Sequence, residues 1–169
     1  MDKRKSRYSK QYDYFSCGPI ALLNAFKWAG CDYSLKKDLK RIKRACKLEH
    51  DGVLVSDFHM ALKKESKNIL KYKRYIKFSV DDMISHLNKG GAIVLNYRFV
   101  LEDYGREIRH FTLITGIKRN KFIVINNNIV KNKIKTIGTI SYEKMKKMIK
   151  SYRKYNLPFP TAWFLTKDN

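Results

Sequence analysis

The sequence lacks most of the patterns that mark secreted, membrane or metal-binding proteins. Its 169 residues include only three cysteines, and Cys17, Cys31 and Cys46 form no CxxC pair. An odd number of cysteines without a secretion signal indicates reduced thiols in an intracellular, cytoplasmic setting, because disulfides persist in oxidising compartments. No apolar run approaches the length of a membrane span, and no signal-type apolar region follows the basic residues 1–10. These absences argue against a disulfide scaffold or a transmembrane protein.

Acidic residues are also scarce. The chain has 15 Asp and Glu against 37 Lys and Arg, which gives a formal net charge of +22. Charge of this sign attracts nucleic acid, anionic membranes or acidic proteins. The basic residues are spread along the chain. Abundant Lys, Asn, Ile and Tyr also fit an AT-biased genome, such as that of an intracellular bacterium or a large virus. If the chain is viral, we expect the protein to be associated with the virion. Two interpretations therefore stay open, compositional bias and a functional polyanion partner.

The content of apolar residues indicates one globular domain, and the order of its expected elements indicates the α+β class. Hydrophobic residues make up 44% and aromatic residues 13% of the chain, enough for a substantial core. No internal repeat or interior linker divides it. We expect a mobile basic arm over residues 1–10 and a single domain over 11–169, with a helical half at 11–90 and a sheet half at 91–169. Helices first and an antiparallel sheet second is an α+β plan.

Periodicity and capping residues predict the individual elements. Helices are expected over 20–28, 35–46, 57–67, 80–88 and 142–153, the last four after the N-caps Ser34, Ser56, Ser79 and Ser141. Strands are expected over 69–72, 75–78, 92–99, 109–117, 122–125 and 161–166, with turns at 102–105 and 118–121. The short turns favour hairpins and therefore an antiparallel sheet.

The stretch from Gln11 to Trp28 carries the clearest chemical signal. Cys17 is followed by Gly18, by Pro19, which favours the first turn of a helix, and then by a nearly unbroken apolar run. Cys17 would lie at the N-terminus of a buried helix, where the helix dipole stabilises an anion and lowers the pKa of a thiol. Gln11 could direct an amide N–H to the same place. The pattern predicts a cysteine nucleophile, and the alternative is an inert buried thiol.

A cysteine nucleophile needs a base and a group that orients the base. His110 is expected to open a strand, and Asn126 is expected to end the next one. The two positions are symmetric about residue 118, so their side chains could be cross-strand neighbours. The side-chain oxygen of Asn126 could then hold one imidazole nitrogen and leave the other for Cys17. Asn127 is the alternative orienting residue, and Asn126 could also be a simple turn residue.

Other titratable residues offer no metal or cofactor site. His50, His59 and His86 have no partner at metal-ligand spacing, so we interpret them as structural or surface residues. Cys46 falls on the apolar stripe of the predicted second helix, where a core thiol is the simplest interpretation. We expect no cofactor and no metal.

Together, Gln11, the segment Cys17-Gly18-Pro19, His110-Phe111 and a paired strand ending at Asn126 resemble a papain-like cysteine peptidase. Within that class the chain is most similar to bacteriocin-leader (double-glycine) peptidases and their stand-alone relatives, from about Gln11 to Leu165. The resemblance implies Cys17 as nucleophile, His110 as general base and acid, Asn126 as orienting residue and Gln11 as oxyanion-hole donor. Asn126 stands where that family has Asp, and Ser16 stands where leader peptidases usually have Asp.

The predicted function is a thiol peptidase that cleaves peptide or isopeptide bonds in a protein or peptide substrate. An inactive papain-like domain that binds nucleic acid or an acidic partner is the main alternative. An acyltransferase is the third, because the same acyl-enzyme can be resolved by an amine. The sequence predicts neither the cleavage specificity nor the oligomeric state.

Overall fold

The computed structural model describes residues 7–13, 15–101, 106–130, 133–154 and 160–168. Its helices are α1 (Cys17–Ala29), α2 (Leu35–Ala45), α3 (Val55–Glu65), α4 (Val80–Asn88) and α5 (Tyr142–Lys154). Its strands are β1 (Leu70–Tyr75), β2 (Ala92–Leu101), β3 (Arg106–Lys118), β4 (Lys121–Val130), β5 (Lys133–Ser141) and β6 (Thr161–Lys167). Among these residues, no helix is both long and apolar enough to cross a bilayer.

The strands form one six-stranded antiparallel sheet in the order β1-β6-β2-β3-β4-β5. The last strand in the chain, β6, inserts between the edge strand β1 and β2, so it joins a strand of the first half of the chain to the hairpins that follow. β2, β3, β4 and β5 follow one another as hairpin neighbours. The α+β class with an antiparallel sheet is therefore confirmed.

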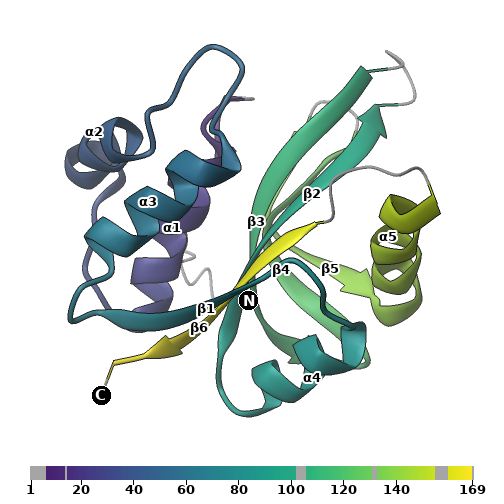
Figure 1. Cartoon of the computed structure of the whole chain (residues 1–169). Coiled ribbons are helices and arrows are strands. Elements are labelled where there is room, and N and C mark those ends of the chain that lie inside the picture. The colour runs from purple at the N-terminus through teal and green to yellow at the C-terminus, as the bar shows by residue number, and fades with distance from the viewer. Residues whose placement is uncertain (1–6, 14, 102–105, 131–132, 155–159, 169) are drawn as a thin grey trace, which may run out of the picture.

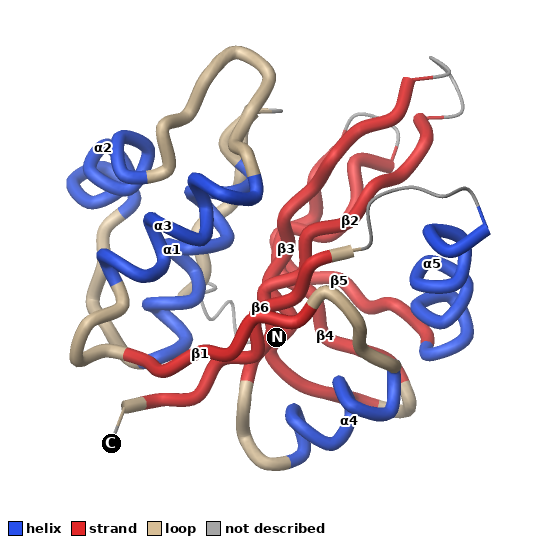
Figure 2. The backbone as a smooth tube through the Cα atoms, viewed as in Figure 1, coloured by secondary structure: helices blue, strands red, loops and turns tan. Residues whose placement is uncertain are grey.

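Helices cover both faces of the sheet, as Figures 1 and 2 show. The first three helices lie on one face, where Phe26, Phe58 and Trp163 belong to one buried cluster. α4 and α5 lie on the other face, over a second cluster that includes Phe122 and Met145. Side chains alternate between the two clusters along β2, because successive residues of a strand point to opposite faces.

Local capping signals explain where several helices begin and end. Ser34 and Ser79 cap α2 and α4 as predicted, and Asp82 completes a capping box with Ser79. Gly30 ends α1 at φ +111°, a conformation that glycine adopts without strain. The N-cap predicted at Ser56 is wrong: α3 begins at Val55, two residues before the predicted start, and its N-cap Leu54 makes no side-chain cap.

Two strand predictions need correction. The strand predicted over 69–72 is β1, which extends to Tyr75 and whose lysines face solvent at the edge of the sheet, whereas the separate strand predicted over 75–78 is wrong, because 76–78 lie outside any strand. β5 was not predicted, because its isoleucines, at 134, 137 and 140, recur every third residue and do not show the alternation typical of a strand. The predicted turn at 102–105 lies outside the described residues.

The basic arm predicted over residues 1–10 is described only from Arg7 onward. Ser9 in that segment is buried, and its main chain exchanges hydrogen bonds with the side chain of Asn24 on α1, at 2.8 and 3.0 Å. Asn126 also donates to the Ser9 carbonyl, at 3.0 Å. Ser9 therefore joins the helical half to β4 and does not behave as part of a free arm.

Candidate active site

Cys17 is the first residue of α1, as predicted, and is 5% exposed. α1 packs on β3, which brings Cys17 to the strand that carries His110. Gly18 permits this close packing. A Cβ at residue 18 would lie 3.2 Å from Cβ of Val53 and 3.6 Å from Cδ2 of Phe111. Sequence and packing thus place the thiol at the helix N-terminus, against the sheet.

Burial dominates the electrostatics of the Cys17 thiol. It raises the pKa of Cys17 to about 11, although the main-chain N–H groups of Phe111, Gly18 and Cys17 itself favour the thiolate. The negative charge of Asp13 raises the pKa further. The lowered pKa predicted from the helix dipole is therefore wrong for this structure, because desolvation of the charged form outweighs the helix N-terminus.

His110 lies inside β3 and does not open it, because the strand already begins at Arg106. The ring is 2% exposed, and its Nε2 atom lies 3.0 Å from the main-chain oxygen of Asn126. Since a carbonyl only accepts, Nε2 carries the proton and Nδ1 carries the lone pair of the neutral ring. Burial lowers the pKa of His110, and the hydrogen bond to Asn126 opposes that shift.

The contact between His110 and Asn126 differs from the one that strand symmetry predicts. The β3–β4 turn is centred on Arg119 and Asn120, both at positive φ, and not on residue 118. His110 and Asn126 are therefore not directly opposite each other. The ring reaches diagonally to the main-chain carbonyl of residue 126, and the side-chain amide takes no part in that hydrogen bond.

The Asn126 side chain joins the two halves of the fold instead. Its Oδ1 accepts from the main-chain N–H of Gln11 at 3.2 Å, and its Nδ2 donates to the Ser9 carbonyl. Asn126 has φ +55°, which asparagine tolerates better than most residues. Asn127 follows it in β4, but the side chain of Asn127 lies outside the described residues. Orientation of His110 by a side-chain amide remains a prediction.

Gln11 lies in the loop before α1 and is 1% exposed. Its Nε2 donates to the main-chain oxygen of Asp13 at 2.6 Å, which uses one of its two hydrogens. Its Oε1 is buried and makes no hydrogen bond within the described part of the chain. The amide has a second N–H, which the hydrogen bond to Asp13 does not use.

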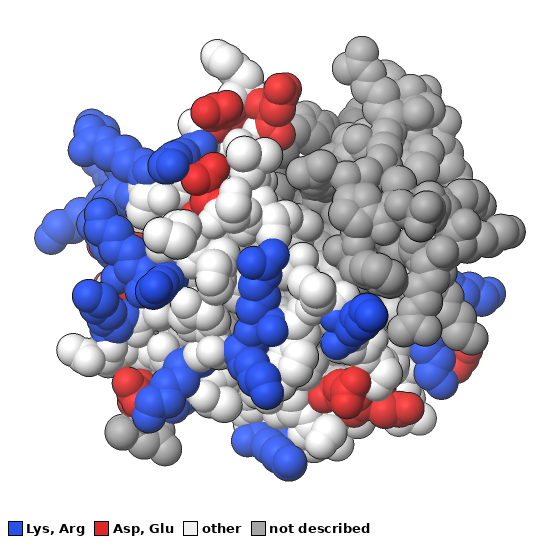
Figure 3. All heavy atoms as spheres, in the orientation of Figure 1, with Lys and Arg blue, Asp and Glu red and all other residues white. Residues whose placement is uncertain are grey.

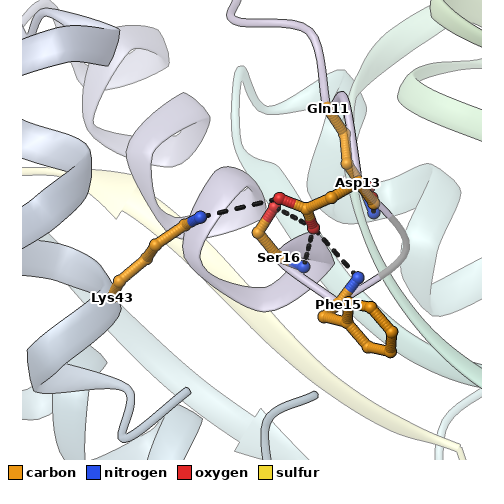
Figure 4. Close-up of polar contacts among 5 residues, drawn as sticks. All are labelled: Gln11, Asp13, Phe15, Ser16 and Lys43. Atoms are coloured by element: carbon orange, nitrogen blue, oxygen red, sulfur yellow. Dashed lines mark hydrogen bonds and ion pairs between the residues drawn. The ribbon is translucent and has the colours of Figure 1, made fainter. Parts of the chain in front are cut away.

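Three residues near the site were missed by the sequence analysis. Tyr97 pairs with His110 across β2 and β3, and its ring meets the imidazole edge-on at 5.6 Å between centroids. Burial raises the pKa of Tyr97. Asp13 organises the loop before Cys17 through its carboxylate (Figure 4). Asn24, fully buried, could have been recognised as a polar residue in an otherwise apolar helix.

His59, His86 and Cys46 have structural surroundings. His59 accepts from Nε1 of Trp163 at 3.2 Å, and His86 Nε2 lies 2.9 Å from the Leu165 carbonyl. Cys46 is a fully buried core thiol, as predicted, and burial raises its pKa to about 12. No group of three potential metal ligands occurs among the described residues.

A pocket of about 620 Å³ opens beside the loop that precedes α1. It is lined by Asp13, Phe15, Lys43 and the α2–α3 loop from Leu48 to Asp51. Phe15 is 49% exposed there. The pocket therefore lies next to the segment that leads directly into Cys17.

Sequence comparison finds no matching family model and no matching curated protein. Solved structures do match. The peptidase domain of Streptococcus ComA, a bifunctional ABC transporter involved in quorum sensing, superposes with a TM-score of 0.63 at 16% identity, covering 93% of this chain and 95% of that one. A C39-like peptidase from Bacillus anthracis gives 0.63 at 11% identity, covering 95% and 94%. A double-glycine-motif protease from an AMS/PCAT transporter, solved with its leader peptide, gives 0.57 at 16% identity, covering 96% and 91%.

These matches define the class of fold: the chain has the architecture of papain-like cysteine peptidases. More narrowly, the neighbours include C39-type and double-glycine peptidases, as the sequence resemblance predicts. At such low identity the likeness applies to the fold, and the activity of this chain is a separate question.

Proposed function

We propose that this protein is a thiol peptidase with Cys17 as nucleophile and His110 as general base and acid. The observation that carries the proposal is the joint placement of the two residues. Cys17 starts a buried helix and its sulfur faces the main-chain N–H of Phe111, the residue that follows His110. The Nε2–H of His110 is held by the Asn126 carbonyl, which leaves Nδ1 as the basic nitrogen.

The resting site holds a neutral thiol and a neutral imidazole, because burial opposes both charged forms. When the substrate carbonyl binds, Nδ1 of His110 takes the thiol proton as sulfur attacks the carbonyl carbon. The C–S bond forms, and the carbonyl π electrons move onto oxygen. The N–H groups of Gln11 and Cys17 stabilise that oxyanion.

Collapse of the tetrahedral intermediate breaks the C–N bond, and His110 gives its proton to the leaving amine. A thioester on Cys17 remains. Water, deprotonated by His110, attacks the thioester, releases the carboxylic acid and returns the proton to the sulfur. An amine in place of water would give transfer. The substrate class we propose is a peptide, since one neighbour of the same fold was solved with a leader peptide.

Cleavage of a peptide library, analysed by mass spectrometry, tests the proposal. Cys17→Ala should abolish cleavage while leaving the melting temperature close to that of the wild type. Cys31→Ala is the matched control, since Cys31 is a free, partly exposed thiol on the same half of the fold. Cleavage that persists in Cys17→Ala, or disappears equally in Cys31→Ala, would refute the assignment.

A second candidate function, polyanion binding, is favoured by the outer face of α2. Lys36, Lys37, Lys40 and Arg44 recur at helical spacing on one exposed stripe, and none has an acidic ion-pair partner among the described residues. Figure 3 shows basic side chains gathered at that edge of the molecule. Such a stripe fits the phosphate backbone of a nucleic acid.

Fluorescence anisotropy with single-stranded DNA at several salt concentrations tests this second function. Replacing Lys36, Lys40 and Arg44 by Gln should weaken binding and reduce the slope of log K against log salt by about 0.7 per lost phosphate contact. The matched control removes the same charge from the β3–β4 hairpin tip, at Lys118, Arg119 and Lys121. Equal losses in both variants would indicate attraction by net charge alone, and Cys17→Ala should change neither value.

A further inference from the structure

The described residues of the loop before α1, which are 11–13, 15 and 16, are organised around one side chain, Asp13 (Figure 4). Its Oδ1 accepts three hydrogen bonds, from the main-chain N–H of Phe15 at 3.0 Å, the main-chain N–H of Ser16 at 2.6 Å and the Ser16 hydroxyl at 2.6 Å. Three donors on one oxygen fix the peptide that runs directly into Cys17.

The Ser16 hydroxyl does not cap the first turn of α1. Ser34 and Ser79 occupy the same N-cap position in α2 and α4, and each accepts a hydrogen bond from the first turn of its helix. Ser16, the N-cap residue of α1, makes no such bond: its main chain has ψ 18°, whereas Ser34 and Ser79 are extended at ψ 142° and 168°, and its hydroxyl donates to Asp13. The N–H groups at the start of α1 therefore stay uncapped by a side chain and are available to an anion.

The main-chain oxygen of Asp13 also holds the Gln11 amide, and the Asp13 carboxylate fixes the turn on which that oxygen lies. Gln11 Nε2 donates to the main-chain oxygen of Asp13 at 2.6 Å, whereas Gln11 Oε1 is buried without a hydrogen bond within the described residues. The amide is thus held through its nitrogen. One residue fixes both the proposed side-chain donor of the oxyanion hole and the turn that presents the main-chain donors.

We propose that Asp13 is a positioning residue of the peptidase site, which holds the Gln11 amide and the N-terminus of α1 in one arrangement for the oxyanion. This inference rests on the proposed peptidase function. Asp13 acts through hydrogen bonds and does not act by its charge, since a negative charge near the thiol disfavours the thiolate. Lys43 lies 3.6 Å from the other carboxylate oxygen and partly neutralises that charge.

The carboxylate is ionised at neutral pH. Burial raises the pKa of Asp13, but the hydrogen bonds from Ser16 and Phe15 and the charge of Lys43 outweigh burial and leave the pKa below its usual value. An Asn at residue 13 would keep an oxygen that accepts the same hydrogen bonds and would lose the charge. Ala would lose both, so the two substitutions separate geometry from charge.

The test compares Asp13→Asn and Asp13→Ala by kcat and KM separately, and by the pH dependence of Cys17 alkylation followed by peptide mapping. Asp13→Ala should lower kcat by about 100-fold with little change in KM, because oxyanion donors lose their alignment. Asp13→Asn should keep kcat within a few-fold and move Cys17 alkylation to lower pH, since the charge is lost. Asp32→Asn, at an exposed aspartate beyond the other end of α1, is the matched control and should change neither value.

Unchanged kcat in Asp13→Ala, measured well below its melting temperature, would overturn the proposal. So would equal losses of kcat in Asp13→Asn and Asp13→Ala, because the acceptor geometry would then not matter. If Asp13→Ala does not fold, Ser16→Ala replaces it as the test, because it removes the hydrogen bond from the Ser16 hydroxyl to Asp13. An unchanged kcat in Ser16→Ala counts against the inference. If the wild type cleaves no peptide, the peptidase function fails by itself. The pH dependence of Cys17 alkylation then tests the role of Asp13. If this pH dependence is identical in Asp13→Ala and Asp13→Asn, Asp13 is not a positioning residue.

Discussion

The two halves of the candidate site are held in place by different kinds of contact. On the helical side, the side chain of Asp13 accepts three hydrogen bonds and shapes the loop before Cys17. On the sheet side, His110 is held by a main-chain carbonyl, that of Asn126, inside a paired strand. The helical half therefore depends on which residue occupies position 13. The sheet half depends on the conformation of the chain at position 126, and less on the side chain there.

The largest effect is expected from removing the base. His110→Ala should reduce kcat/KM by about 100- to 10,000-fold, the usual contribution of a general acid–base residue. His50→Ala is the matched control, because His50 is an exposed histidine in the α2–α3 loop. Peptide cleavage measured side by side gives the ratio. A loss in His50→Ala as large as that in His110→Ala would show that the effect is not specific to the sheet half.

The thiol of Cys17 should respond strongly to pH. Burial raises its pKa to about 11, so thiolate is scarce at neutral pH. The alkylation rate of Cys17 by iodoacetamide should rise about tenfold per unit from about pH 7 to pH 10, without reaching a plateau. A plateau near neutral pH would instead indicate a thiolate–imidazolium pair, and the pH-independent rate would measure its population.

The raised pKa of Cys17 also predicts how the stability of the fold depends on pH. A thiol whose pKa is higher in the folded chain than in the unfolded chain keeps a proton that the unfolded chain releases. The contribution of Cys17 is therefore present below about pH 8.5 and lost as pH rises toward about 11. Urea unfolding of the wild type and of Cys17→Ala should converge in stability as pH rises through this range. A difference that does not change with pH would contradict the raised pKa.

The sequence predicts which residues come into contact more reliably than it predicts which of their atoms form the contact. Apolar runs and capping serines identify most helices, and the position of Cys17 at a helix start follows from Pro19 and the run behind it. The contact between His110 and the main-chain carbonyl of Asn126 was not predicted, because the β3–β4 turn lies at Arg119 and Asn120. The strand register therefore differs from the one expected for a turn centred on residue 118. Register depends on turn geometry, which a single sequence specifies only loosely.

Asp13 was missed for a related reason. Its hydrogen bonds run to neighbours two and three residues away, a local pattern that short polar residues form in many loops. Nothing in the sequence distinguishes such a loop from an ordinary turn until the fold shows what lies beside it. Gln11 and Asn126 likewise meet across 115 residues, through a bond from main chain to side chain that periodicity does not predict.

Packing of α1 against the α2–α3 loop can be tested through Gly18. A Cβ at this position would lie 3.2 and 3.3 Å from Val53 side-chain atoms, closer than ordinary contact. Gly18→Ala should therefore lower the free energy of unfolding by about 1–3 kcal/mol, the usual cost of overpacking a core. Gly116→Ala is the matched control, since its Cβ would meet only Ile123, at 3.9 Å. Val53→Ala should relieve the loss in the double variant, and failure to do so would mean that Val53 is not the obstacle.

The smallest effect should come from the Asn126 side chain, and it tests the comparison most directly. Asn126→Gly keeps the positive φ and the carbonyl that accepts from His110, but removes the bonds to Ser9 and Gln11. Two lost hydrogen bonds should lower the free energy of unfolding by about 2 kcal/mol. Peptide cleavage should stay within a few-fold of the wild type, because the carbonyl still holds the ring.

Asn126→Ala separates the backbone from the side chain. It removes the same hydrogen bonds as the glycine variant, but its Cβ disfavours φ +55° by about 1 kcal/mol or more. Activity should therefore fall further in Asn126→Ala than in Asn126→Gly, although both lack the amide. If instead both variants lose as much activity as His110→Ala, the side-chain amide orients the imidazole during catalysis. The two halves of the site would then both depend on side-chain identity.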